Sequence, residues 1–512
     1  MRGDPGLSRI GRWICPVLLG ALLTLLSIRT AGVFLDFIAS IRFPFELDYG
    51  EGIVWQQAVL IPGPRMYGNS QDLPFIVFHY PPLYYLLARA ALSIQPDFLA
   101  AGRLVSAVSA VLTALSVAAL VRISARGGGR PIARAECAIA LAAGLLVLRL
   151  DTVHVWSLLM RVDMAAIALG MMGLLLGAWA NGRFWGTTLS LLICVASVFT
   201  KQTQLPAGAA VFLIALLCNP RGALYAAAIA GILGLGALGL MQWLTDGGFL
   251  LNIVSYNINR YSLRNVYRLF LGVQQANRPF WVLMPIAAGA ILRGLFHQRP
   301  GDPWRRTIDH SLVRFRQADR ATTARAMLLV HFTLASLMLL IAGKSGASSN
   351  YLLDWDCVGC VLIGVLLCDL VGDQWRFSLV VTTLIVGVLI LPQRRIPDRF
   401  LQEQLGPMTA LVDRIAAAKK PVASEAMTLL MRAGKPVIFE PAIATELASI
   451  GRWNEGPLVD MIRSGGFAFM ITTNNTVGGS GSRTPAVDAA MREAYPQVED
   501  LTRGLWLHLP LQ

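Results

Sequence analysis

Glu46-Leu47-Asp48-Tyr49-Gly50-Glu51-Gly52 is the stretch around which this sequence is organised. It contains three carboxylates within seven residues and follows directly on the first long apolar segment. Carboxylates are costly near hydrocarbon, so ionisable groups in membrane proteins tend to mark functional sites. Because most of the remaining sequence is apolar, we expect this acidic stretch to lie at a membrane boundary and to have a chemical role.

The composition predicts a protein that crosses a membrane several times. Of the 512 residues, 55% are hydrophobic and 14% are charged, and the mean hydropathy is +0.57; soluble domains average about 25% charged residues. The net charge of +14 fits arginine-rich loops against an anionic membrane surface, and we expect no nucleic-acid partner. The seven cysteines are scattered, mostly in apolar segments, and do not indicate a disulfide framework.

Apolar segments give about eleven candidate spans, since a membrane helix needs roughly 20 apolar residues. The first follows a basic N-terminus, and we expect it to be retained rather than cleaved as a signal peptide. The candidates are 13–39, 101–121, 137–150, 164–180, 187–204, 206–218, 223–244, 280–296, 326–343, 351–372 and 377–392.

Lysine and arginine placement predicts the orientation, because cytoplasmic loops are enriched in these residues. The N-terminus and the connections 122–134 and 293–325 are basic, so we expect them to be cytoplasmic. The acidic stretch and the C-terminus then face the periplasm of a bacterial inner membrane. The other connections predicted on that side are 151–163, 200–205, 245–279 and 344–350.

The predicted periplasmic connection 245–279 does not follow the charge rule. It contains Arg260, Arg264, Arg268 and Arg278. Either this connection has an anionic partner, or the span count is wrong by one.

Two regions outside the spans have a predicted structure. In the first periplasmic loop, 42–99, the segment from Phe78 to Leu87 is aromatic and amphipathic but too short to span. We expect a helix along the outer membrane surface that begins at Pro81-Pro82. After the membrane part, 1–395, residues 396–512 alternate between strand and helix patterns and predict a small periplasmic α/β domain. Its expected strands are 421–425, 436–440, 467–472 and 505–509, and its expected helices are 457–463 and 485–495.

The acidic stretch offers two candidate catalytic carboxylates, Asp48 and Glu51. Three residues apart, they would share one face of a helix or converge in a turn. Either one would serve as a base that takes a proton from a hydroxyl group. The alternative is a solvated acidic loop, and the neighbouring aromatic helix favours the catalytic interpretation.

Further polar residues interrupt the apolar segments near the same membrane face. Arg161 and Asp163 predict either an ion pair at a helix end or part of a site, and Lys201 either reaches toward water or binds a phosphate. Asn350 and Tyr351 either bind a ligand or cap a helix.

Other polar residues of the membrane part have weaker functional predictions. Asp354 and Asp356 are functional candidates within a span, whereas the Cys357-Val-Gly-Cys360 motif indicates helix packing. No metal motif is present. The alternative is a divalent cation shared by Asp48, Glu51, Asp151, His154 and Asp163.

In order, these segments resemble the GT-C glycosyltransferases, which use polyprenyl- or dolichyl-phosphate sugars and include protein mannosyltransferases and the aminoarabinose transferases of lipid A. The resemblance covers the whole membrane part. It is carried by Asp48-Tyr49-Gly50-Glu51-Gly52, Tyr80-Pro81-Pro82-Leu83-Tyr84-Tyr85, Arg161-Val162-Asp163-Met164, Lys201-Gln202-Thr203 and Ser349-Asn350-Tyr351-Leu352-Leu353. The family often has two adjacent acids in its first loop, whereas the acids are separated here.

The resemblance implies transfer of a sugar from a polyprenyl-phosphate donor to a hydroxyl of a lipid, glycan or protein, with inversion and with Asp48 as base. The resemblance implies no particular cofactor, and a divalent cation is the open alternative. Cationic side chains would stabilise the leaving phosphate. The residues expected to bind the donor are Lys201, Arg161, Asp163, Arg260, Arg264, His79, Tyr80, Asn350 and Tyr351.

Two other functions are compatible with many spans and buried polar groups. A transporter or flippase of lipid-linked sugars would predict internal repeats and paired broken helices, which the sequence does not display. A polymerase or ligase of the O-antigen type would predict a large central outer loop in place of acids in the first loop.

Overall fold

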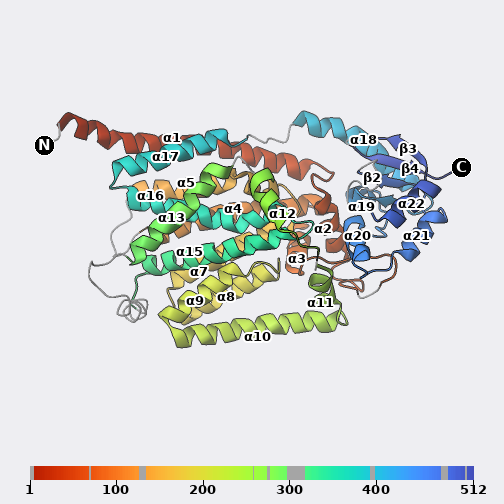
Figure 1. The fold of residues 1–512 in the computed structure, drawn as a ribbon, viewed down its shortest axis with the longest axis horizontal. Helices are drawn as coiled ribbons and strands as arrows, with labels where there is room; N and C mark the ends of the chain where they lie inside the picture. The colour runs from red at the N-terminus through yellow and green to blue at the C-terminus, as the bar shows by residue number, and fades with distance from the viewer. Residues whose placement is uncertain are drawn as a thin grey trace.

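The computed structural model describes residues 5–68, 71–125, 134–257, 259–273, 277–296, 317–392, 398–473, 483–501 and 504–511. Most of the predicted cytoplasmic connections 122–134 and 293–325 lies outside these ranges. Figure 1 shows an elongated bundle of helices with a small α/β unit, residues 398–511, at one end.

Each predicted span falls on one helix of the bundle. Among the described residues, six helical stretches are suited by length and composition to cross a membrane, and a seventh is added if α5 (Arg134–Arg149) and α6 (Asp151–Ser157), bent by 64°, form one broken span. The chain is therefore multi-pass, while the number of eleven spans stays a prediction. The helices are α1 (Pro5–Arg42), α4 (Phe98–Ser124), α5 (Arg134–Arg149), α7 (Val162–Ala180), α8 (Phe184–Val198), α9 (Pro206–Cys218), α10 (Pro220–Leu244), α13 (Arg278–Phe296), α15 (Arg320–Met338), α16 (Leu353–Leu370) and α17 (Gln374–Ile390).

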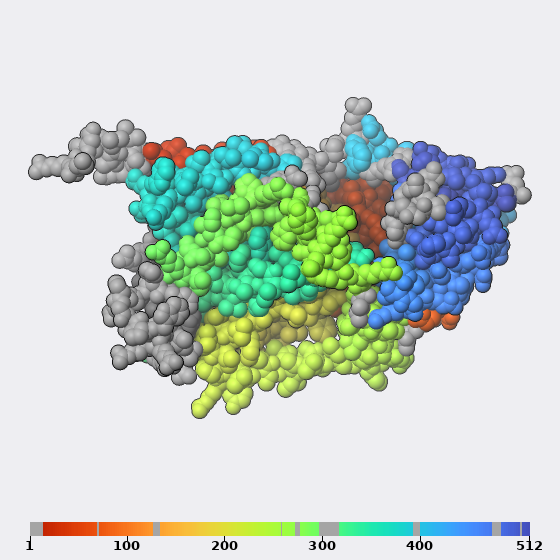
Figure 2. All heavy atoms as spheres, viewed as in Figure 1, coloured from red at the N-terminus to blue at the C-terminus, as the bar shows by residue number. Residues whose placement is uncertain are grey.

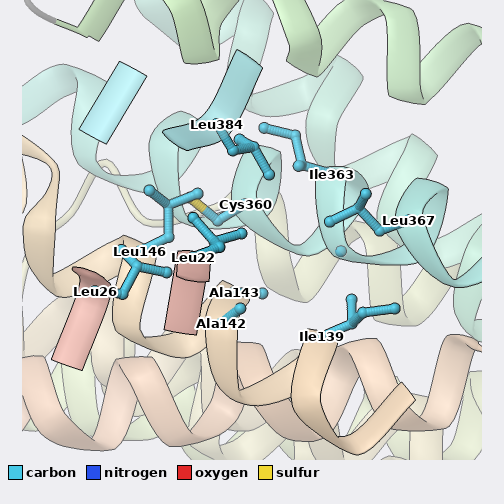
Figure 3. Close-up of a pocket in the computed structure, with 11 residues that line it drawn as sticks. Leu22, Leu26, Ile139, Ala142, Ala143, Leu146, Cys360, Ile363, Leu367 and Leu384 are labelled. Carbon is cyan, nitrogen blue, oxygen red and sulfur yellow. The ribbon is translucent and has the colours of Figure 1, made fainter. Parts of the chain in front are cut away.

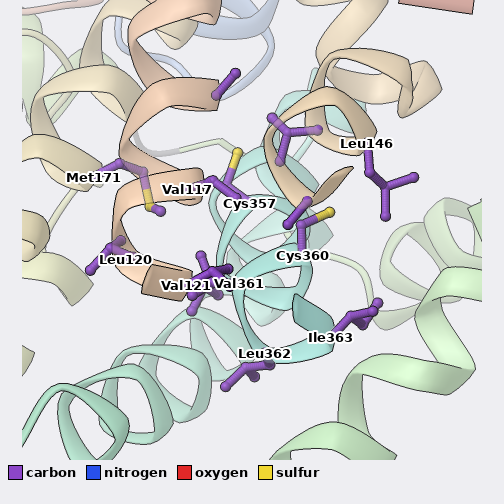
Figure 4. Close-up of a cluster of buried hydrophobic side chains, with 14 of the residues drawn as sticks. Val117, Leu120, Val121, Leu146, Met171, Cys357, Cys360, Val361, Leu362 and Ile363 are labelled. Atoms are coloured by element: carbon purple, nitrogen blue, oxygen red, sulfur yellow. The ribbon is translucent and has the colours of Figure 1, made fainter. Parts of the chain in front are cut away.

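Helix α16 lies at the centre of the bundle. Cys357 and Cys360 are fully buried and surrounded by apolar side chains such as Val117 and Leu146 (Figure 4). These surroundings agree with the predicted role of the Cys357-Val-Gly-Cys360 motif in helix packing. Beside Cys360, an apolar cavity between α1, α5, α16 and α17 has a volume of about 10 Å³ (Figure 3), which is room for one water molecule at most.

Short helices surround one end of the bundle. They are α2 (Tyr49–Leu60), α3 (Leu83–Ala91), α11 (Gly248–Ile253), η1 (Ser255–Asn257), α12 (Leu263–Arg268), η2 (Leu269–Val273), η4 (Leu339–Gly343) and η5 (Ser349–Leu352). Helix α3 begins after Pro82, as predicted. Its aromatic side chains do not all face the lipid, however: Tyr84 and Tyr85 are fully buried, and the Tyr84 hydroxyl donates to the carbonyl of Gly102 at 2.9 Å.

In its described residues, the C-terminal unit has one four-stranded sheet in the order β1-β2-β4-β3. β1 pairs with β2 in parallel, and the other neighbours are antiparallel, with Met470 opposite His508 and Val498 opposite His508 on the other side. The elements are α18 (Asp398–Ala417), β1 (Ala423–Ser424), α19 (Met427–Arg432), α20 (Pro441–Ser449), α21 (Gly456–Arg463), β2 (Met470–Thr472), α22 (Pro485–Ala494), β3 (Gln497–Asp500) and β4 (Trp506–Leu509).

One prediction for this unit is wrong, and one of its strands was not predicted. Residues 436–440 do not form a strand of the sheet, because Phe439 makes only an isolated parallel bridge to Phe75 of the first loop. The sequence also did not predict β3, whose four residues are all exposed and lack the apolar alternation of a half-buried strand.

The C-terminal unit is docked on the first loop. The rings of Phe75 and Trp453 stack with centroids 4.5 Å apart, and Arg432 of α19 forms an ion pair with Asp97 at the start of α4. In Figure 1, α2 and α3 lie between the bundle and this unit. The interface positions α20 beside the acidic stretch.

Candidate active site

A cavity of about 510 Å³ lies where the bundle meets the C-terminal unit. In Figure 2 the surface is hollowed between α12 and the C-terminal unit, with atoms of the first hundred residues at the bottom of the hollow. The cavity is lined by parts of the acidic stretch and of the segments 151–163, 200–205, 245–279, 344–350 and 440–446. All the segments predicted to share one membrane face therefore lie at the same end of the protein.

Asp48 lines this cavity at the N-terminus of α2. Its backbone is extended, and Oδ1 accepts hydrogen bonds from the Gly50 amide at 2.9 Å and from Arg161 Nη1 at 2.7 Å. Oδ2 accepts none from the described residues. The side chain is 40% exposed to the cavity. Arg161 lies 5.0 Å from the Trp156 ring centroid and so approaches Asp48 from one fixed side.

Glu51 does not line the cavity. Its side chain is fully buried against Arg103, which is fully buried too. The Glu51 oxygens also accept from the amides of Leu47 and Met160, each at 2.7 Å. The two predicted catalytic carboxylates thus have different environments, one open to the cavity and one saturated with hydrogen bonds.

Lys201 and Asp163 form an ion pair at the inner wall, with Nζ 2.5 Å from Oδ1. Asn350 donates to the same oxygen at 2.9 Å, and the Lys201 ammonium lies 4.8 Å from the Tyr351 ring centroid. Asp163 sits behind the lining residues, whereas the other three line the cavity. The predicted alternative of an Arg161–Asp163 pair is wrong, because each residue has its own partner from a distant segment.

His79 and Tyr80 line the cavity beside the C-terminal unit. The His79 carbonyl accepts from Gln202 at 3.0 Å, and His79 Nε2 lies 3.9 Å from Glu440 Oε2. The Tyr80 carbonyl accepts from the Tyr67 hydroxyl at 2.7 Å.

Arg260 and Arg264 do not line the cavity. Both are exposed, and Arg260 contacts the C-terminal unit: its amide donates to Glu446 at 3.1 Å and its guanidinium to the Ser449 carbonyl at 3.2 Å. The structure therefore does not bring these two predicted donor-binding side chains into the cavity.

The five residues considered for a shared cation do not meet. Among the described residues, no group of three His, Cys, Asp or Glu side chains has the arrangement of a metal site. Glu51 binds Arg103, Asp163 binds Lys201, and His154 Nε2 lies 3.0 Å from Asp36. Separate partners within the protein explain these residues without a common ion.

Several lining residues were not predicted as parts of the site. Lys344, Gln202, Trp156, Glu440 and Glu446 all line the cavity. Glu440 begins α20, accepts from the Ala442 and Ile443 amides, and is hydrogen-bonded to the Tyr49 hydroxyl. The Glu440-Pro441 pair in the sequence is typical of a helix start. The sequence does not show that this helix start lies against a loop almost 400 residues earlier.

Burial changes the acidity of two groups near the mouth of the cavity. Removal from water, together with the nearby Glu51 and Asp48, raises the pKa of Glu46 to about 8, although hydrogen bonds from Thr428 act in the opposite direction. Burial and the neighbouring Glu440 carboxylate raise the pKa of Tyr49. The phenol of Tyr49 therefore stays a hydrogen-bond donor at neutral pH.

Buried polar atoms without a hydrogen-bond partner gather at this cavity. In the part of the chain that the structure describes, they include Oδ2 of Asp163 and atoms of five lining residues. An unpaired buried polar atom costs about 1–3 kcal/mol, and because most of these atoms are acceptor oxygens, they favour a ligand rich in hydroxyl donors. The five are His79 Nε2, Arg161 Nε, Gln202 Oε1, Asn259 Oδ1 and Asn350 Oδ1.

Comparisons with known proteins give similarity in structure only. No family model matches the sequence, and no curated protein matches it. The fold is similar to that of ArnT from Cupriavidus metallidurans bound to undecaprenyl phosphate, with a TM-score of 0.58, 13% identity, and 94% of this chain and 97% of that chain covered. The apo state of the same protein gives a TM-score of 0.50 with the same identity and coverage.

A more distant match is the archaeal oligosaccharyltransferase AglB from Archaeoglobus fulgidus, in complex with an inhibitory peptide and a dolichol-phosphate. Its TM-score is 0.46 at 11% identity, with 94% of this chain and 74% of that chain covered. The match to ArnT extends over almost the full length of both chains, including the C-terminal unit. The chain therefore has the fold of ArnT, and this agrees with the predicted resemblance at the level of the fold.

Proposed function

We propose that this protein is an integral-membrane glycosyltransferase that moves a sugar from a polyprenyl-phosphate donor to an acceptor hydroxyl. The observation that carries the proposal is one cavity with an accessible carboxylate, Asp48, together with the cationic side chains Lys201 and Lys344. The solved structure of ArnT, which has this fold, contains undecaprenyl phosphate. The buried unpaired polar atoms around the cavity supply hydrogen-bonding groups for a sugar.

Asp48 is the general base in this proposal. Its Oδ1 is held by Gly50 and Arg161, which leaves Oδ2 to accept the proton of the acceptor hydroxyl. The acceptor oxygen then forms a bond to the anomeric carbon while the bond from that carbon to the phosphate oxygen breaks. A single displacement of this kind inverts the anomeric centre, and the electron pair leaves with the polyprenyl phosphate.

The leaving phosphate needs positive charge more than it needs a proton. Lysines at the inner wall, such as Lys201, provide it in a site partly closed to water, where electrostatic stabilisation is strongest. Asp163 fixes the Lys201 ammonium before the reaction, and Asn350 donates to the same Asp163 oxygen, so little reorganisation accompanies the charge that develops.

The proposed location is the inner membrane of a bacterium, with the N-terminus in the cytoplasm. The membrane part, 1–395, would contain the catalytic residues, and the unit 396–512 would lie in the periplasm with Glu440 and Glu446 at the cavity wall. The acceptor, a lipid, a glycan or a protein, would enter between the two.

The test uses the full-length protein in nanodiscs with a set of polyprenyl-phosphate sugars, and measures sugar-dependent release of free polyprenyl phosphate. We expect release by the wild type and a loss of at least a hundredfold in Asp48→Asn. Asp373→Asn is a matched control, because Asp373 also caps a helix and pairs with an arginine, but far from the cavity.

Three other results would contradict the proposal. If Asp48→Asn kept full activity while Glu51→Gln lost activity at wild-type stability, Glu51 and not Asp48 would be the base. Movement of lipid-linked sugar across a sealed vesicle membrane without release of lipid phosphate would indicate a transporter. Elongation of a lipid-linked glycan, with no transfer from monosaccharide donors, would indicate a polymerase.

A further inference from the structure

The segment 343–350 runs from the last residue of η4 into η5 and forms part of the cavity wall. Its first residues pair with the segment 260–262 as a short antiparallel bridge, Tyr261 opposite Lys344. The Gly343 carbonyl accepts from the Ser262 amide at 2.8 Å, and the Ser345 amide donates to the Arg260 carbonyl at 2.7 Å. The backbone on both sides of Lys344 is therefore held in place.

Gly343 makes this pairing possible. A Cβ at this position would lie 2.5 Å from the Tyr261 ring, so any larger residue would force the ring or the strand pair apart. The backbone of Lys344 is therefore fixed, and its side chain lines the cavity.

The Lys344 ammonium shares an aromatic ring with Lys201. Lys344 Nζ lies 5.8 Å and Lys201 Nζ 4.8 Å from the Tyr351 ring centroid. Two ammonium groups against one ring repel each other unless negative charge lies nearby. Asp163 compensates Lys201 at 2.5 Å, and no carboxylate among the described residues forms an ion pair with Lys344.

The other permanent cation that lines the cavity is compensated as well. Arg161 is paired with Asp48 at 2.7 Å. In the described part of the wall, Lys344 is thus the permanent cation that no ion pair compensates, although the carboxylates of Glu440 and Glu446 also line the cavity. An anion bound beside Tyr351 would compensate the charge of the Lys344 ammonium.

We infer that Lys344 is the direct ligand of the phosphate group of the lipid-linked donor, and that Lys201, held by Asp163, contributes its positive charge from beside it. This inference rests on the proposed function, because the anion it requires is the donor's phosphate. The residue acts by charge and hydrogen bonding: Nζ donates to a phosphate oxygen and stabilises the lipid phosphate as it leaves. No proton is transferred.

The experiment measures binding and turnover separately. Binding of undecaprenyl phosphate to the full-length protein in detergent is followed by ligand-induced thermal stabilisation, with undecaprenol and inorganic phosphate as the other two probes. We expect Lys344→Ala to weaken undecaprenyl phosphate binding by about ten- to a hundredfold, the range for loss of a charged hydrogen bond, and to leave undecaprenol binding unchanged. Inorganic phosphate binding as tight as that of the lipid would assign the site to free phosphate instead.

Three variants serve as comparisons. Lys344→Arg should retain most of the affinity, because it keeps the charge, and Lys344→Gln keeps a polar side chain of similar length if the alanine variant folds poorly. Lys419→Ala removes one positive charge from an exposed position in the C-terminal unit, and we expect wild-type binding from it.

Two results are decisive against the inference. If the wild type turns over donor and Lys344→Ala binds undecaprenyl phosphate with unchanged affinity, Lys344 is not the phosphate ligand, although the proposed function stands. If the wild type neither binds undecaprenyl phosphate nor releases it from any donor, the proposed function fails and this inference fails with it.

Discussion

Arg103 holds both carboxylate oxygens of Glu51 in the fully buried interior below the cavity. Nε donates to Oε1 at 2.8 Å and Nη2 to Oε2 at 2.7 Å, and the guanidinium also donates to three backbone carbonyls at the end of α1 and the start of the first loop. Planar two-point pairing of this kind is among the strongest in proteins. Glu51 and Arg103 thus fix the loop that presents Asp48.

Glu51→Ala should destabilise the protein. The change leaves the Arg103 guanidinium buried without its carboxylate, which costs about 3–5 kcal/mol. The measurement is the thermal unfolding midpoint in detergent, which we expect to fall by several degrees, with parallel loss of folded yield. Asp48→Asn is the comparison, and it should unfold near the wild-type midpoint. A Glu51→Ala protein that is as stable as the wild type but inactive would refute this structural role.

Gly50→Ala should separate Arg161 from Asp48. A Cβ at Gly50 would lie 1.3 Å from Arg161 Nη1, so the guanidinium must move away from the carboxylate. Displacing a catalytic group by about 1 Å can lower turnover about a hundredfold, and we expect a loss of 10- to 100-fold in polyprenyl phosphate release. Gly231→Ala in α10, where a Cβ meets no atom within 4 Å, should have wild-type activity. Equal activity in the two variants would mean that the Arg161–Asp48 contact is not needed.

The membrane helices were predictable from the sequence because their signal is local. Long apolar runs with short polar breaks coincide with the bundle helices, and arginine placement correctly grouped the segments that meet at one end. The start of α3 at Pro82 was also visible, since proline favours the first turn of a helix.

The pairing of charged residues was not predictable in the same way. Arg161 and Asp163 are two residues apart, yet Arg161 binds a residue more than 100 positions earlier and Asp163 binds Lys201. The partner that each charged residue binds depends on how the helices pack, and no local sequence pattern encodes that packing. For the same reason the sequence did not predict that Glu440 and Glu446 reach the cavity, although it predicted a separate C-terminal α/β unit.

Trp453→Ala should loosen the C-terminal unit from the first loop. Trp453 is buried, stacks on Phe75, and donates its indole N–H to the Gln71 carbonyl at 3.0 Å. Truncation of a buried tryptophan costs about 3–5 kcal/mol. We expect faster amide hydrogen exchange in α20 and α21 while the membrane helices exchange as in the wild type. Trp375→Ala removes a tryptophan that is 76% exposed on α17 and should leave this exchange unchanged. Faster exchange in both variants would show that the effect is not local.

Glu46→Gln should change how stability depends on pH. Glu46 Oε2 accepts from the Thr428 hydroxyl at 2.8 Å across the interface with the C-terminal unit, and burial raises the pKa of this carboxyl to about 8 from 4.5. Below about pH 4.5 the group is protonated in both the folded and the unfolded protein, so the stabilising effect of its folded environment on the neutral form is fully present. Between pH 4.5 and 8 the folded protein keeps the proton that the unfolded chain releases, and the free energy of unfolding falls by up to about 1.4 kcal/mol per pH unit.

Glutamine has no proton to lose, so Glu46→Gln should remove this contribution. We expect the variant and the wild type to be similarly stable near pH 5 and the variant to be more stable by pH 8 to 9, as measured by denaturant unfolding at each pH. Other titrating groups affect both proteins alike and cancel in the difference. A difference that does not change with pH would mean that Glu46 titrates in the folded protein as it does in the unfolded chain, and that its burial at the Thr428 contact does not favour the protonated form.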